Sequence, residues 1–387
     1  MPPQQFLVVG AGIAGLATAV ALQRRGHDVM VIDSRSDTTT GAGISIWPNA
    51  LAALDHIGLG DAVRDSGGRI TAGALRWRDG TWLRRPSRER IVKALGEPLV
   101  VVRRSVLNDV LAGALKSGTL HTGVAAEDIE TVSDGVRVTL SDSTTMQAAA
   151  VVGADGTHSM VARHLNGPLN NRYVGYTAWR GIADATMDPA LAGETLGPGR
   201  ECGHVPLGPD HTYWFATERT SEGGSAPHGE LAYLKSEFGS WAEPLPQLLA
   251  ATDPNAVLRN DLYDRDQARV WSKGPIVLVG DAAHPMRPHL GQGGCQGLED
   301  AAILASFVDQ NSDPATAFAR FADFRRPRVR SLVRESTRIG QVLNLRPAVL
   351  SAVVGRATAL VPEAVLTRHL AAVASRSAFT APTAASA

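Results

Sequence analysis

Three glycines near the start of the chain have the spacing of a nucleotide-binding turn. Gly10, Gly12 and Gly15 follow a short apolar run at 6–9 and precede an alanine- and leucine-rich stretch that predicts a helix. The first glycine permits a tight turn, the second lets the backbone approach a pyrophosphate, and the third lets the helix pack closely on the strand. Asp33 ends the next apolar run, where a carboxylate accepts hydrogen bonds from an adenosine ribose. The segment therefore predicts a dinucleotide-binding βαβ unit, without choosing between NAD and FAD.

Two later segments place acids and glycines at the ends of predicted strands. Asp155 and Gly156 follow a predicted buried strand, and Asp281 follows another and leads into a proline-containing turn. A glycine-rich helix start comes next, and it offers free N–H groups and a partial positive charge to a flat, electron-rich ligand. A surface loop without function is the alternative, but it fits poorly with so many glycines beside prolines and a helix.

The remaining residues predict the elements that position these motifs. Buried strands are expected at 6–9, 29–32, 149–152 and 275–279, and helices at 14–25, 49–57, 104–115, 295–309 and from 315 onward. Hairpins are expected at 74–84 and 128–140, around the Asp-Gly pairs Asp79-Gly80 and Asp134-Gly135. Between 173 and 264 apolar and polar residues alternate, which predicts an antiparallel sheet with one face turned to a pocket. The fold class is therefore α/β, with a Rossmann-like domain split along the chain, an inserted antiparallel β-sheet domain and C-terminal helices.

Composition limits the class of protein. A chain of 387 residues favours two domains, and the 44% hydrophobic and 20% charged residues are those of an ordinary globular protein. The 38 basic and 38 acidic residues balance, so nothing favours nucleic acid or a membrane surface as a partner. The two cysteines, Cys202 and Cys295, suit a reducing compartment. Because we also find no leader, apolar membrane span or metal motif, a cytoplasmic enzyme or binding protein is expected.

Taken together, the three motifs resemble those of the single-component flavoprotein aromatic hydroxylases, the group with the para-hydroxybenzoate hydroxylase fold. The resemblance extends to about residue 340 and keeps the order of the family's motifs. It implies an FAD cofactor in the Rossmann-like domain and a substrate bound by the inserted sheet. The implied division is 1–72, 98–172 and 265–340 for the FAD domain, 73–97 and 173–264 for the substrate domain, 341–376 for C-terminal helices and 377–387 for a disordered tail.

The resemblance also implies roles toward FAD. The glycines of the first motif would cradle the pyrophosphate, and Asp33, more often Glu in the family, would hold the adenosine ribose. Arg104 would contact the phosphate and ribityl region, and Asp281 the ribityl or ribose hydroxyls. The acid–glycine pair of the second motif is associated with both FAD pyrophosphate and NAD(P)H, and the turn at 288–294 would lie beside the isoalloxazine. The expected cofactor-binding residues are Gly10, Gly12, Ala14, Gly15, Asp33, Ser34, Arg35, Gly43, Arg104, Asp155, Gly156, Asp281, Pro288, Gly291, Gly293 and Gly294.

Two sequence patterns that are absent limit the types of reaction to be expected. A second glycine fingerprint after a strand, which reductases with two dinucleotide domains would need, does not occur. The Trp-x-Trp-x-Ile-Pro pattern of flavin halogenases is also missing. Both absences favour monooxygenation over disulfide reduction or halogenation.

The substrate is less well defined. Three segments look closest to urate hydroxylases and zeaxanthin epoxidases: residues 41–49, 175–181 and 291–295. Tyr213 matches the aromatic substrate contact of the urate type, but Glu201 stands where an arginine should grip urate, and His289 stands where an acid follows the flavin-side proline. Since a glutamate cannot supply paired donors to urate oxygens, urate is discounted.

The expected pocket suits an apolar aromatic or polycyclic substrate with one or two polar anchors. The alternative is that these aromatic residues fill the core between sheet and helices. Tyr213 and Phe215 must point to the opposite face of their strand from Trp214, so one set is expected to be core. The candidate substrate-binding residues are Trp47, Trp179, Arg180, His204, Tyr213, Trp214, Phe215 and His289.

Pro288, His289 and Tyr213 are the expected catalytic residues. His289 is placed to take a phenolic or indolic proton, because its ordinary pKa is near neutrality. A hydrogen-bonded loop histidine without chemistry is the alternative. His284, earlier in the turn, is expected to bond backbone groups.

The resemblance implies that NAD(P)H reduces FAD and that O₂ then forms a C4a-hydroperoxyflavin, which hydroxylates an aromatic or heteroaromatic small molecule. A second hypothesis is epoxidation of an isoprenoid alkene. Membrane association is not expected, but a membrane-borne alkene would give the apolar helices at 345–370 a role. A third hypothesis is a flavoprotein whose redox state controls a partner.

Overall fold

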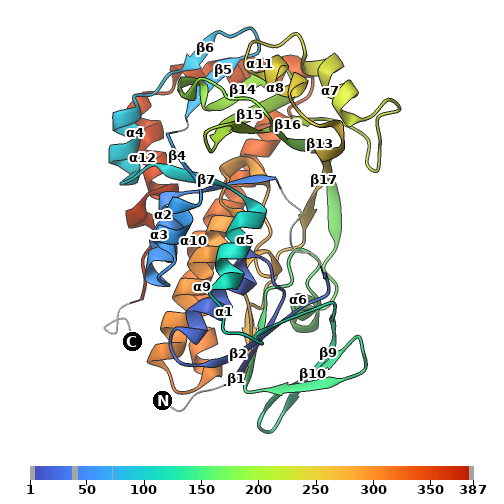
Figure 1. Cartoon of the computed structure of the whole chain (residues 1–387), viewed down its shortest axis with the longest axis vertical. Coiled ribbons are helices and arrows are strands. Elements are labelled where there is room, and N and C mark those ends of the chain that lie inside the picture. The colour runs from blue at the N-terminus through green and yellow to red at the C-terminus, as the bar shows by residue number, and fades with distance from the viewer. Residues whose placement is uncertain (1–4, 37–41, 72, 383–387) are drawn as a thin grey trace.

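A computed structural model describes residues 5–36, 42–71 and 73–382 (Figure 1). Gly41, the first four residues and 383–387, which the expectations above include, lie outside these ranges. Along the long axis, an α/β layer with β1 and β2 lies at one end and the layer of β13 to β16 at the other, with β7 between them (Figure 1). The described chain thus has the mixed α/β architecture that the sequence predicts.

A six-stranded sheet forms the α/β layer, in the order β18-β19-β12-β1-β2-β8. All neighbouring strands run parallel except the edge pair β18 and β19. The predicted buried strands are confirmed, since β12 lies between β1 and β19 and joins segments far apart in the sequence. The strands are β1 (Gln5–Val9), β2 (Asp28–Asp33), β8 (Leu120–Thr122), β12 (Ala150–Gly153), β18 (Ser272–Lys273) and β19 (Ile276–Leu278).

Each face of this sheet is covered by a different layer. One face packs against helices, and its core joins Phe6 and Val8 with Leu16 of α1 and Leu298 of α9. The other face packs against a three-stranded sheet that includes the predicted second hairpin, now confirmed. The elements are α1 (Ile13–Gln23), α2 (Pro48–His56), α3 (Gly60–Asp65), α5 (Arg104–Gly113), α9 (Gly293–Gln310), β9 (Ala126–Val132), β10 (Gly135–Leu140), β11 (Thr145–Ala148) and α6 (Met160–Asn166).

A seven-stranded sheet in the order β17-β13-β16-β15-β14-β5-β6 forms the second layer. The first predicted hairpin, β5 and β6, is confirmed and extends this sheet through a parallel pairing of β5 with β14. Helices α7 and α8 cover one face. The bounds are β5 (Ala74–Trp77), β6 (Trp82–Arg84), β13 (Asn171–Ala183), β14 (Gly193–Gly197), β15 (Arg200–Leu207), β16 (His211–Glu218), β17 (Leu258–Arg265), α7 (Glu230–Phe238) and α8 (Leu245–Ala250).

Between the two layers lies a small sheet in the order β3-β7-β4. The long helix α10 runs beside it from one layer toward the other (Figure 1). The remaining elements are β3 (Gly43–Ile46), β4 (Gly68–Ile70), β7 (Leu99–Arg103), α4 (Arg88–Leu95), α10 (Pro314–Leu343), α11 (Ala348–Ala357) and α12 (Glu363–Ala374).

The C-terminal segment differs from the expected disordered tail. A short helix at Arg376–Ala378 is followed by Phe379, whose ring lies 5.9 Å from that of His56. The Gln310 side chain donates to the Pro382 carbonyl. Contacts with distant elements therefore fix residues 377–382. The small-residue composition of the tail, from which disorder was expected, gives no sign of these contacts.

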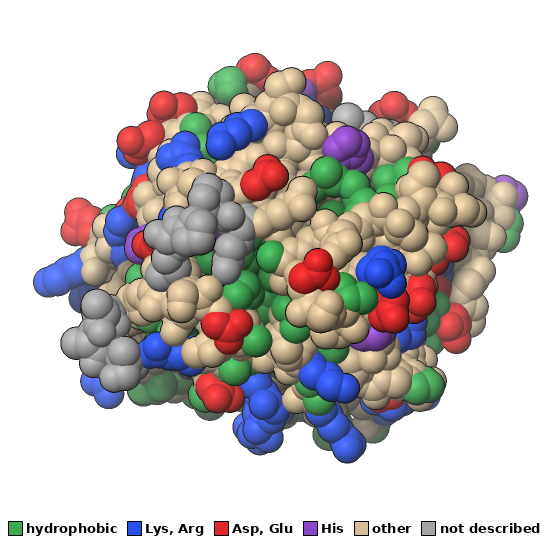
Figure 2. Space-filling view, turned by 90° about the horizontal axis from the view of Figure 1, so that it is seen from below, with side chains coloured by type: hydrophobic (Ala, Val, Ile, Leu, Met, Phe, Trp, Pro, Cys, Tyr) green, Lys and Arg blue, Asp and Glu red, His purple; other side chains and the backbone are tan. Residues whose placement is uncertain are grey.

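The charged side chains of the surface are mixed in sign. Basic and acidic side chains are interspersed over the face shown in Figure 2, in keeping with the balanced charge.

Among the described residues no single helix is long and apolar enough to cross a membrane. The bent pair Ala348–Leu360 and Glu363–Ala374 would be long and apolar enough if its two helices are counted together.

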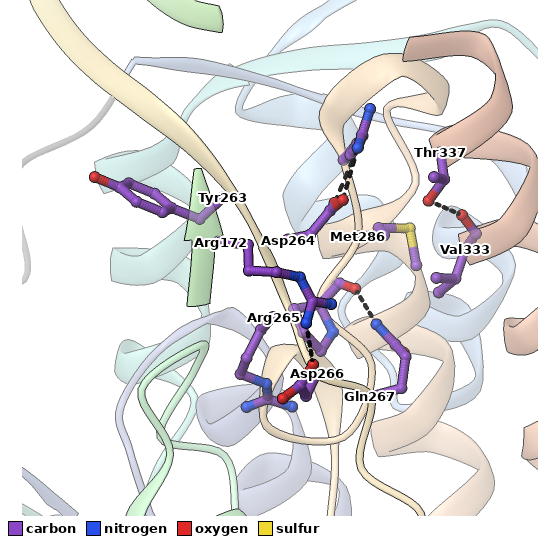
Figure 3. A pocket seen from close by; sticks show the side chains of 11 residues that line it. Arg172, Tyr263, Asp264, Arg265, Asp266, Gln267, Met286, Val333 and Thr337 are labelled. Atoms are coloured by element: carbon purple, nitrogen blue, oxygen red, sulfur yellow. Dashed lines mark hydrogen bonds and ion pairs between the residues drawn. The ribbon is translucent and has the colours of Figure 1, made fainter. Parts of the chain in front are cut away.

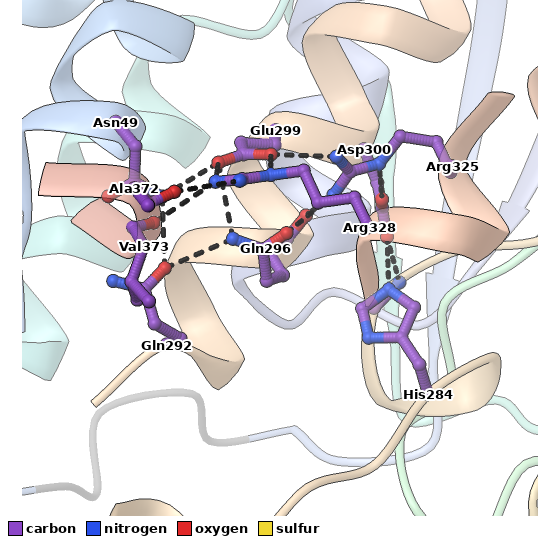
Figure 4. A network of polar contacts seen from close by, with 11 residues as sticks. Asn49, His284, Gln292, Gln296, Glu299, Asp300, Arg325, Arg328, Ala372 and Val373 are labelled. Carbon is purple, nitrogen blue, oxygen red and sulfur yellow. Dashed lines mark hydrogen bonds and ion pairs between the residues drawn. The ribbon is translucent and has the colours of Figure 1, made fainter. Parts of the chain in front are cut away.

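A buried ionic network joins the helices that carry the third motif (Figure 4). The Arg325 guanidinium on α10 donates to Asp300 at 2.7 Å and to Glu299 at 2.7 Å, and all three side chains are at most 1% exposed. Asp300 also accepts from the Gly280 N–H at 2.8 Å and lies 2.6 Å from His284. The network thus sets the position of the turn after β19 relative to α9 and α10. His284, expected to bond backbone, instead contacts a carboxylate.

The network predicts a large cost for removing its cation. The Arg325→Met variant leaves buried Asp300 without a guanidinium and Glu299 with only that of Arg328, so the free energy of unfolding should fall by about 3–5 kcal/mol. Chemical unfolding followed by circular dichroism measures this loss. The matched control is Arg330→Met on the exposed face of the same helix, for which about 0.5 kcal/mol or less is expected. Equal losses in the two variants would contradict the role assigned to Arg325.

Candidate functional site

The first glycine motif forms a turn in which two positions have no room for a side chain. Gly10 has a φ of 107°, and a Cβ there would lie 2.4 Å from the Ala154 carbonyl oxygen. A Cβ on Gly15 would lie 1.9 Å from the Gly10 carbonyl oxygen. These contacts bring α1 close to the ends of β1 and β12.

The middle glycine of this motif, Gly12, faces open space instead. A Cβ on Gly12 would have no atom within 4 Å, and Gly12 caps α1 without any side-chain hydrogen bond to the first turn. The N–H groups and the positive dipole end of α1 are therefore available to an anion such as a pyrophosphate. Ala14 lies on the opposite side of the helix, where a Cβ on Gly280 would approach its Cβ to 2.7 Å.

Asp33 stabilises the glycine turn directly. One carboxylate oxygen accepts from the Ala11 N–H at 2.7 Å, and the other accepts from the Arg35 N–H at 2.8 Å. Asp33 is buried, whereas the Arg35 side chain and Ser34 are exposed beside it. The carboxylate thus orients the turn and still has acceptor capacity left, since each carboxylate oxygen can accept more than one bond.

The second motif holds an acid in a similar setting. Asp155 accepts from the backbone N–H groups of Met160 and Val161 at 2.7 and 3.3 Å, which caps the start of α6. Its other oxygen, Oδ1, is buried without a hydrogen-bond partner, and burial raises the pKa of this carboxyl. Gly156 beside it has a φ of 73° and open space where a Cβ would lie. An orphaned buried oxygen next to an open glycine indicates a ligand that completes this site.

Asp281 and Arg104 face each other across the same region. Asp281 lies in the short turn Gly280–Ala282 after β19, and its side chain is exposed in a recess of the protein. Desolvation raises the pKa of its carboxyl, while the charges of His284 and Arg104 oppose that shift. Arg104 begins α5, so the ends of β7 and β19 both contribute a charged side chain here.

The third motif ends in a turn that leads directly into α9. Pro288–Leu290 forms a short helix, Gly291 follows in the left-handed region with a φ of 61°, and α9 begins at Gly293 without a side-chain cap. Trp47 lies against this turn, since a Cβ on Gly291 would lie 3.0 Å from its Nε1 atom. That N–H is buried and has no partner. The uncapped start of α9 and Gly294 present free backbone donors in the same region.

Together these features fit FAD. The uncapped start of α1 and the open Gly12 suit the pyrophosphate, and the oxygens of Asp155 and Asp281 suit hydroxyl donors. The turn before α9 supplies donors for the polar edge of a flat ring. The glycine turn, Asp155 and Asp281 follow β1, β12 and β19, which are neighbouring parallel strands, and ligands of such folds bind at the carboxyl ends of these strands.

The register of the seven-stranded sheet divides the expected substrate residues between its two faces. Tyr213 pairs with Val205 and Ile182, and Phe215 pairs with Gly203 and Arg180, so these side chains share a face. Tyr213 lies over Gly43 of β3, because a Cβ there would come within 2.6 Å of its ring. This face is therefore turned toward the small sheet and the third motif. Arg180 donates to Asn260 on the same sheet.

Three expected substrate residues lie on the other face and leave the predicted pocket. Trp179 and Trp214 are at most 1% exposed in the core under α7 and α8, and their indoles donate to Glu230 and Thr252. His204 is also buried there, and desolvation lowers its pKa to about 4. The alternating pattern predicts that one set is core, which is confirmed, but only the register shows which set.

His289 lies between the sheet and α10. Its Nε2 atom is 2.7 Å from the Tyr176 hydroxyl, and its Nδ1 atom is 3.6 Å from Oε2 of Glu201. Its side chain is 2% exposed, and a Cβ on Gly340 of α10 would lie 2.5 Å from its ring. Both ring nitrogens thus face protein groups, so His289 reaches a substrate only through these neighbours. The sequence places His289 at the flavin-side turn but gives no sign of Tyr176 as its partner.

A second acid lies near Glu201. Glu194 on β14 is on the same sheet face, because Leu196 pairs with Glu201 and alternate residues share a face. Burial and then the charge of Glu201 raise the pKa of Glu194 to about 8. Sequence reasoning missed Glu194, since its significance depends on a neighbour across the sheet.

A separate groove lies beyond the third motif, between β17 and α10 (Figure 3). Its volume is about 200 Å³. Arg172 and Arg287 are held by Asp266 and Asp264, while Arg265 donates to the carbonyls of Thr157 and Ala282. Arg265 therefore connects the second motif to the third from behind the proposed cofactor region. The groove-lining residues are Arg172, Tyr263, Asp264, Arg265, Asp266, Gln267, Pro285, Met286, Arg287, Val333 and Thr337.

Comparison with known proteins supports this assignment. The family model described as "FAD binding domain" matches residues 4–197 and 250–336. Aurachin C monooxygenase/isomerase from Stigmatella aurantiaca is 37% identical over 339 residues, 87% of this chain and 88% of that protein. The 3-amino-4-hydroxybenzoate 2-monooxygenase from Streptomyces cremeus is 34% identical over 352 residues, 88% of each protein. The solved structure of Klebsiella pneumoniae HpxO complexed with FAD and uric acid aligns with a TM-score of 0.89 and 26% identity, covering 96% of both chains.

The glycine turn predicts different outcomes for two conservative variants. Gly15→Ala should disrupt the fold near the turn, whereas Gly12→Ala should cost about 1 kcal/mol of stability or less because its Cβ meets only open space. Gly12→Ala should still lose FAD, since the methyl group occupies the approach of the pyrophosphate. Flavin absorbance per protein after desalting, together with thermal unfolding of the apoprotein, measures both effects. Full FAD retention by Gly12→Ala would contradict the assigned cradle.

Glu194 predicts a pH dependence of stability. Its folded pKa of about 8 exceeds its ordinary value of 4.5, so the unfolded chain releases this proton first and the folded state loses stability as the pH rises between these values. Glu194→Gln removes the effect. The melting temperature of the variant relative to the native protein should therefore be higher at pH 9 than at pH 5, measured on FAD-loaded samples. An unchanged difference at the two pH values would show that Glu194 titrates normally.

Proposed function

The chain belongs to the FAD-binding-domain family and is a flavin-dependent monooxygenase, and from this premise we propose that it uses NAD(P)H and O₂ to hydroxylate an aromatic or heteroaromatic small molecule. One oxygen atom would enter a ring C–H bond, the other would leave as water, and NAD(P)H would supply the two electrons. Both relatives named above are monooxygenases by their names, and the name of one gives an aminohydroxybenzoate as its substrate, which supports this class of substrate.

The observation that carries the proposal is the sheet face opposite the third motif. Tyr213 and Phe215 present their rings on this face, beside Glu201 and the His289 turn. An aromatic substrate can pack on these rings while polar groups orient it. We place the substrate between this face and the flavin.

FAD, when bound, takes two electrons from NAD(P)H and activates O₂ for transfer to the ring. The chain's residues position it: the start of α1 would hold the pyrophosphate, Asp155, Arg104 and Asp281 its polar groups, and Pro288 to Gly294 its ring. The sheet above would exclude water from the reacting ring.

Proton removal from the substrate is the proposed role of the His289 cluster. A phenolic or indolic ring becomes more reactive toward an electrophilic oxygen when it loses its proton. The Tyr176 hydroxyl lies 2.7 Å from Nε2 of His289, so this hydroxyl can take a proton from the substrate while passing its own proton to the imidazole. In this proposal His289 acts through its neighbours and does not touch the ring itself.

Epoxidation of an isoprenoid alkene is the second candidate, and one observation favours it. The segment from α11 to α12 exposes apolar side chains, among them Val349 of α11 at 68% and Leu360, in the short helix Thr358–Leu360 between them, at 84%. Such a surface would suit a substrate delivered from a lipid phase.

One experiment separates the candidates. NAD(P)H oxidation by the FAD-loaded protein is followed with phenols, indoles and polyenes, and the products are identified by mass. A ring product heavier by one oxygen, with stimulated oxidation, is the expected result. An oxygenated alkene would favour the epoxidase, and no stimulation by any compound would favour a redox-controlled binding protein and contradict both enzyme proposals.

His289→Asn gives a specific test of the proton path. Because asparagine cannot take up a proton, the variant should lose whatever pH dependence of kcat/KM His289 causes in the native enzyme. His121→Asn, exposed on β8, is the matched control and should keep the native profile. A profile unchanged by His289→Asn would remove the proton role and leave His289 as a structural contact.

A further inference from the structure

Glu201 is a buried carboxylate without an adequate partner. The residue is 3% exposed, and its Oε2 atom has no hydrogen-bond donor. The Nδ1 atom of His289 lies 3.6 Å from this oxygen, too far for a hydrogen bond. A buried carboxylate oxygen normally accepts at least one hydrogen bond, so Glu201 lacks a donor that a ligand can supply.

Glu201 also lies where a ring would bind. It shares its sheet face with Gly203, and a Cβ on Gly203 would come within 2.1 Å of the Phe215 ring, so that ring covers the position next to Glu201. Tyr213 extends the aromatic surface further along the same face. A flat substrate packed on these two rings therefore has one edge near the carboxylate.

The charges around this edge are acidic. Glu194 lies beside Glu201 and raises the local negative charge when it ionises. Two cations belong to this face. Arg287 forms an ion pair with Asp264 at 2.6 Å, and Arg180 lies on β13, two strands away from Glu201, where it donates to Asn260 at 2.8 Å. A substrate carboxylate at the Glu201 edge would therefore meet two acids first, an arrangement that repels anions.

We propose that Glu201 selects a substrate whose ring carries an N–H donor at the edge facing it, such as an aminophenol, indole or quinolone, and that the site rejects ring carboxylates. This inference rests on the proposed hydroxylase function and names the substrate class for that same site. The N–H group gives Oε2 the hydrogen bond it lacks, and a bond to a charged acceptor is among the stronger ones. Glu201 is thus a specificity-determining residue.

Matched ring pairs test this selection by binding alone. Each pair differs by one carboxylate: 2-aminophenol and 3-amino-4-hydroxybenzoate, indole and indole-3-carboxylate, 4-hydroxyquinoline and 4-hydroxyquinoline-2-carboxylate. The FAD-loaded protein is titrated with each compound, and the change in flavin absorbance gives Kd. In at least one pair the ring without the carboxylate should bind about tenfold or more tightly than its partner.

Glu201→Gln assigns the preference to this side chain. The variant keeps the size of the residue but removes its charge, so the ratio of the two Kd values should fall toward one, with FAD content unchanged. Glu127→Gln, exposed on β9, is the matched control and should keep the native ratio. If the Glu201→Arg variant folds, it should bind the compound with the carboxylate more tightly than the neutral compound of the same pair.

Three results would overturn the inference: equal or tighter binding of the carboxylates, a ratio unchanged by Glu201→Gln, or no binding of any of the three neutral rings. A different result would contradict the proposed hydroxylase function alone. If the neutral rings bind with the expected preference but neither stimulate NAD(P)H oxidation nor give oxygenated products, the hydroxylase proposal is wrong and the selection by Glu201 stands.

Discussion

The burial of Arg325 is the constraint on which the rest of this structure depends. A guanidinium that is 1% exposed is tolerated only where carboxylates and amides meet it with good geometry, because removing charges from water costs several kcal/mol. Asp300 and Glu299 on α9 satisfy it, and Asp300 in turn holds the Gly280 N–H. Burial alone would raise the pKa of Asp300, but His284, Arg325 and the Gly280 N–H outweigh it and lower the pKa to about 2. The turn that would border the flavin is therefore fixed by charge as well as by packing.

The same network extends to the end of the chain. Arg328 donates to Glu299 at 2.8 Å and to the Val373 carbonyl of α12 at 3.1 Å (Figure 4). Asn49 of α2 reaches Glu299 as well, at 2.7 Å. One buried acid thus connects α2, α9, α10 and α12. The C-terminal helices contribute to the positioning of the cofactor turn although they lie outside the glycine motifs.

Local patterns account for what the sequence predicts well. A buried parallel strand is a short apolar run, the two predicted hairpins turn at Asp-Gly pairs, and the turn at Gly10 excludes any side chain, so each of these features depends on residues that are neighbours in the sequence. Features that depend on residues far apart in the sequence cannot be predicted in this way. The face on which Trp179 and Trp214 lie depends on strand register, which a bulge between Tyr173 and Thr177 alters. The contacts of the C-terminal segment likewise depend on elements far away in the chain.

The pair of Glu201 and His289 shows why fold resemblance and substrate must be argued separately. The urate-type pattern would place an arginine at position 201 and an acid at position 289, whereas in this chain an acid and a histidine face each other at 3.6 Å. A glutamate accepts hydrogen bonds where an arginine would donate them. Because buried polar groups must be matched, the proposed selection by Glu201 would change which ring is bound without changing the fold that holds it.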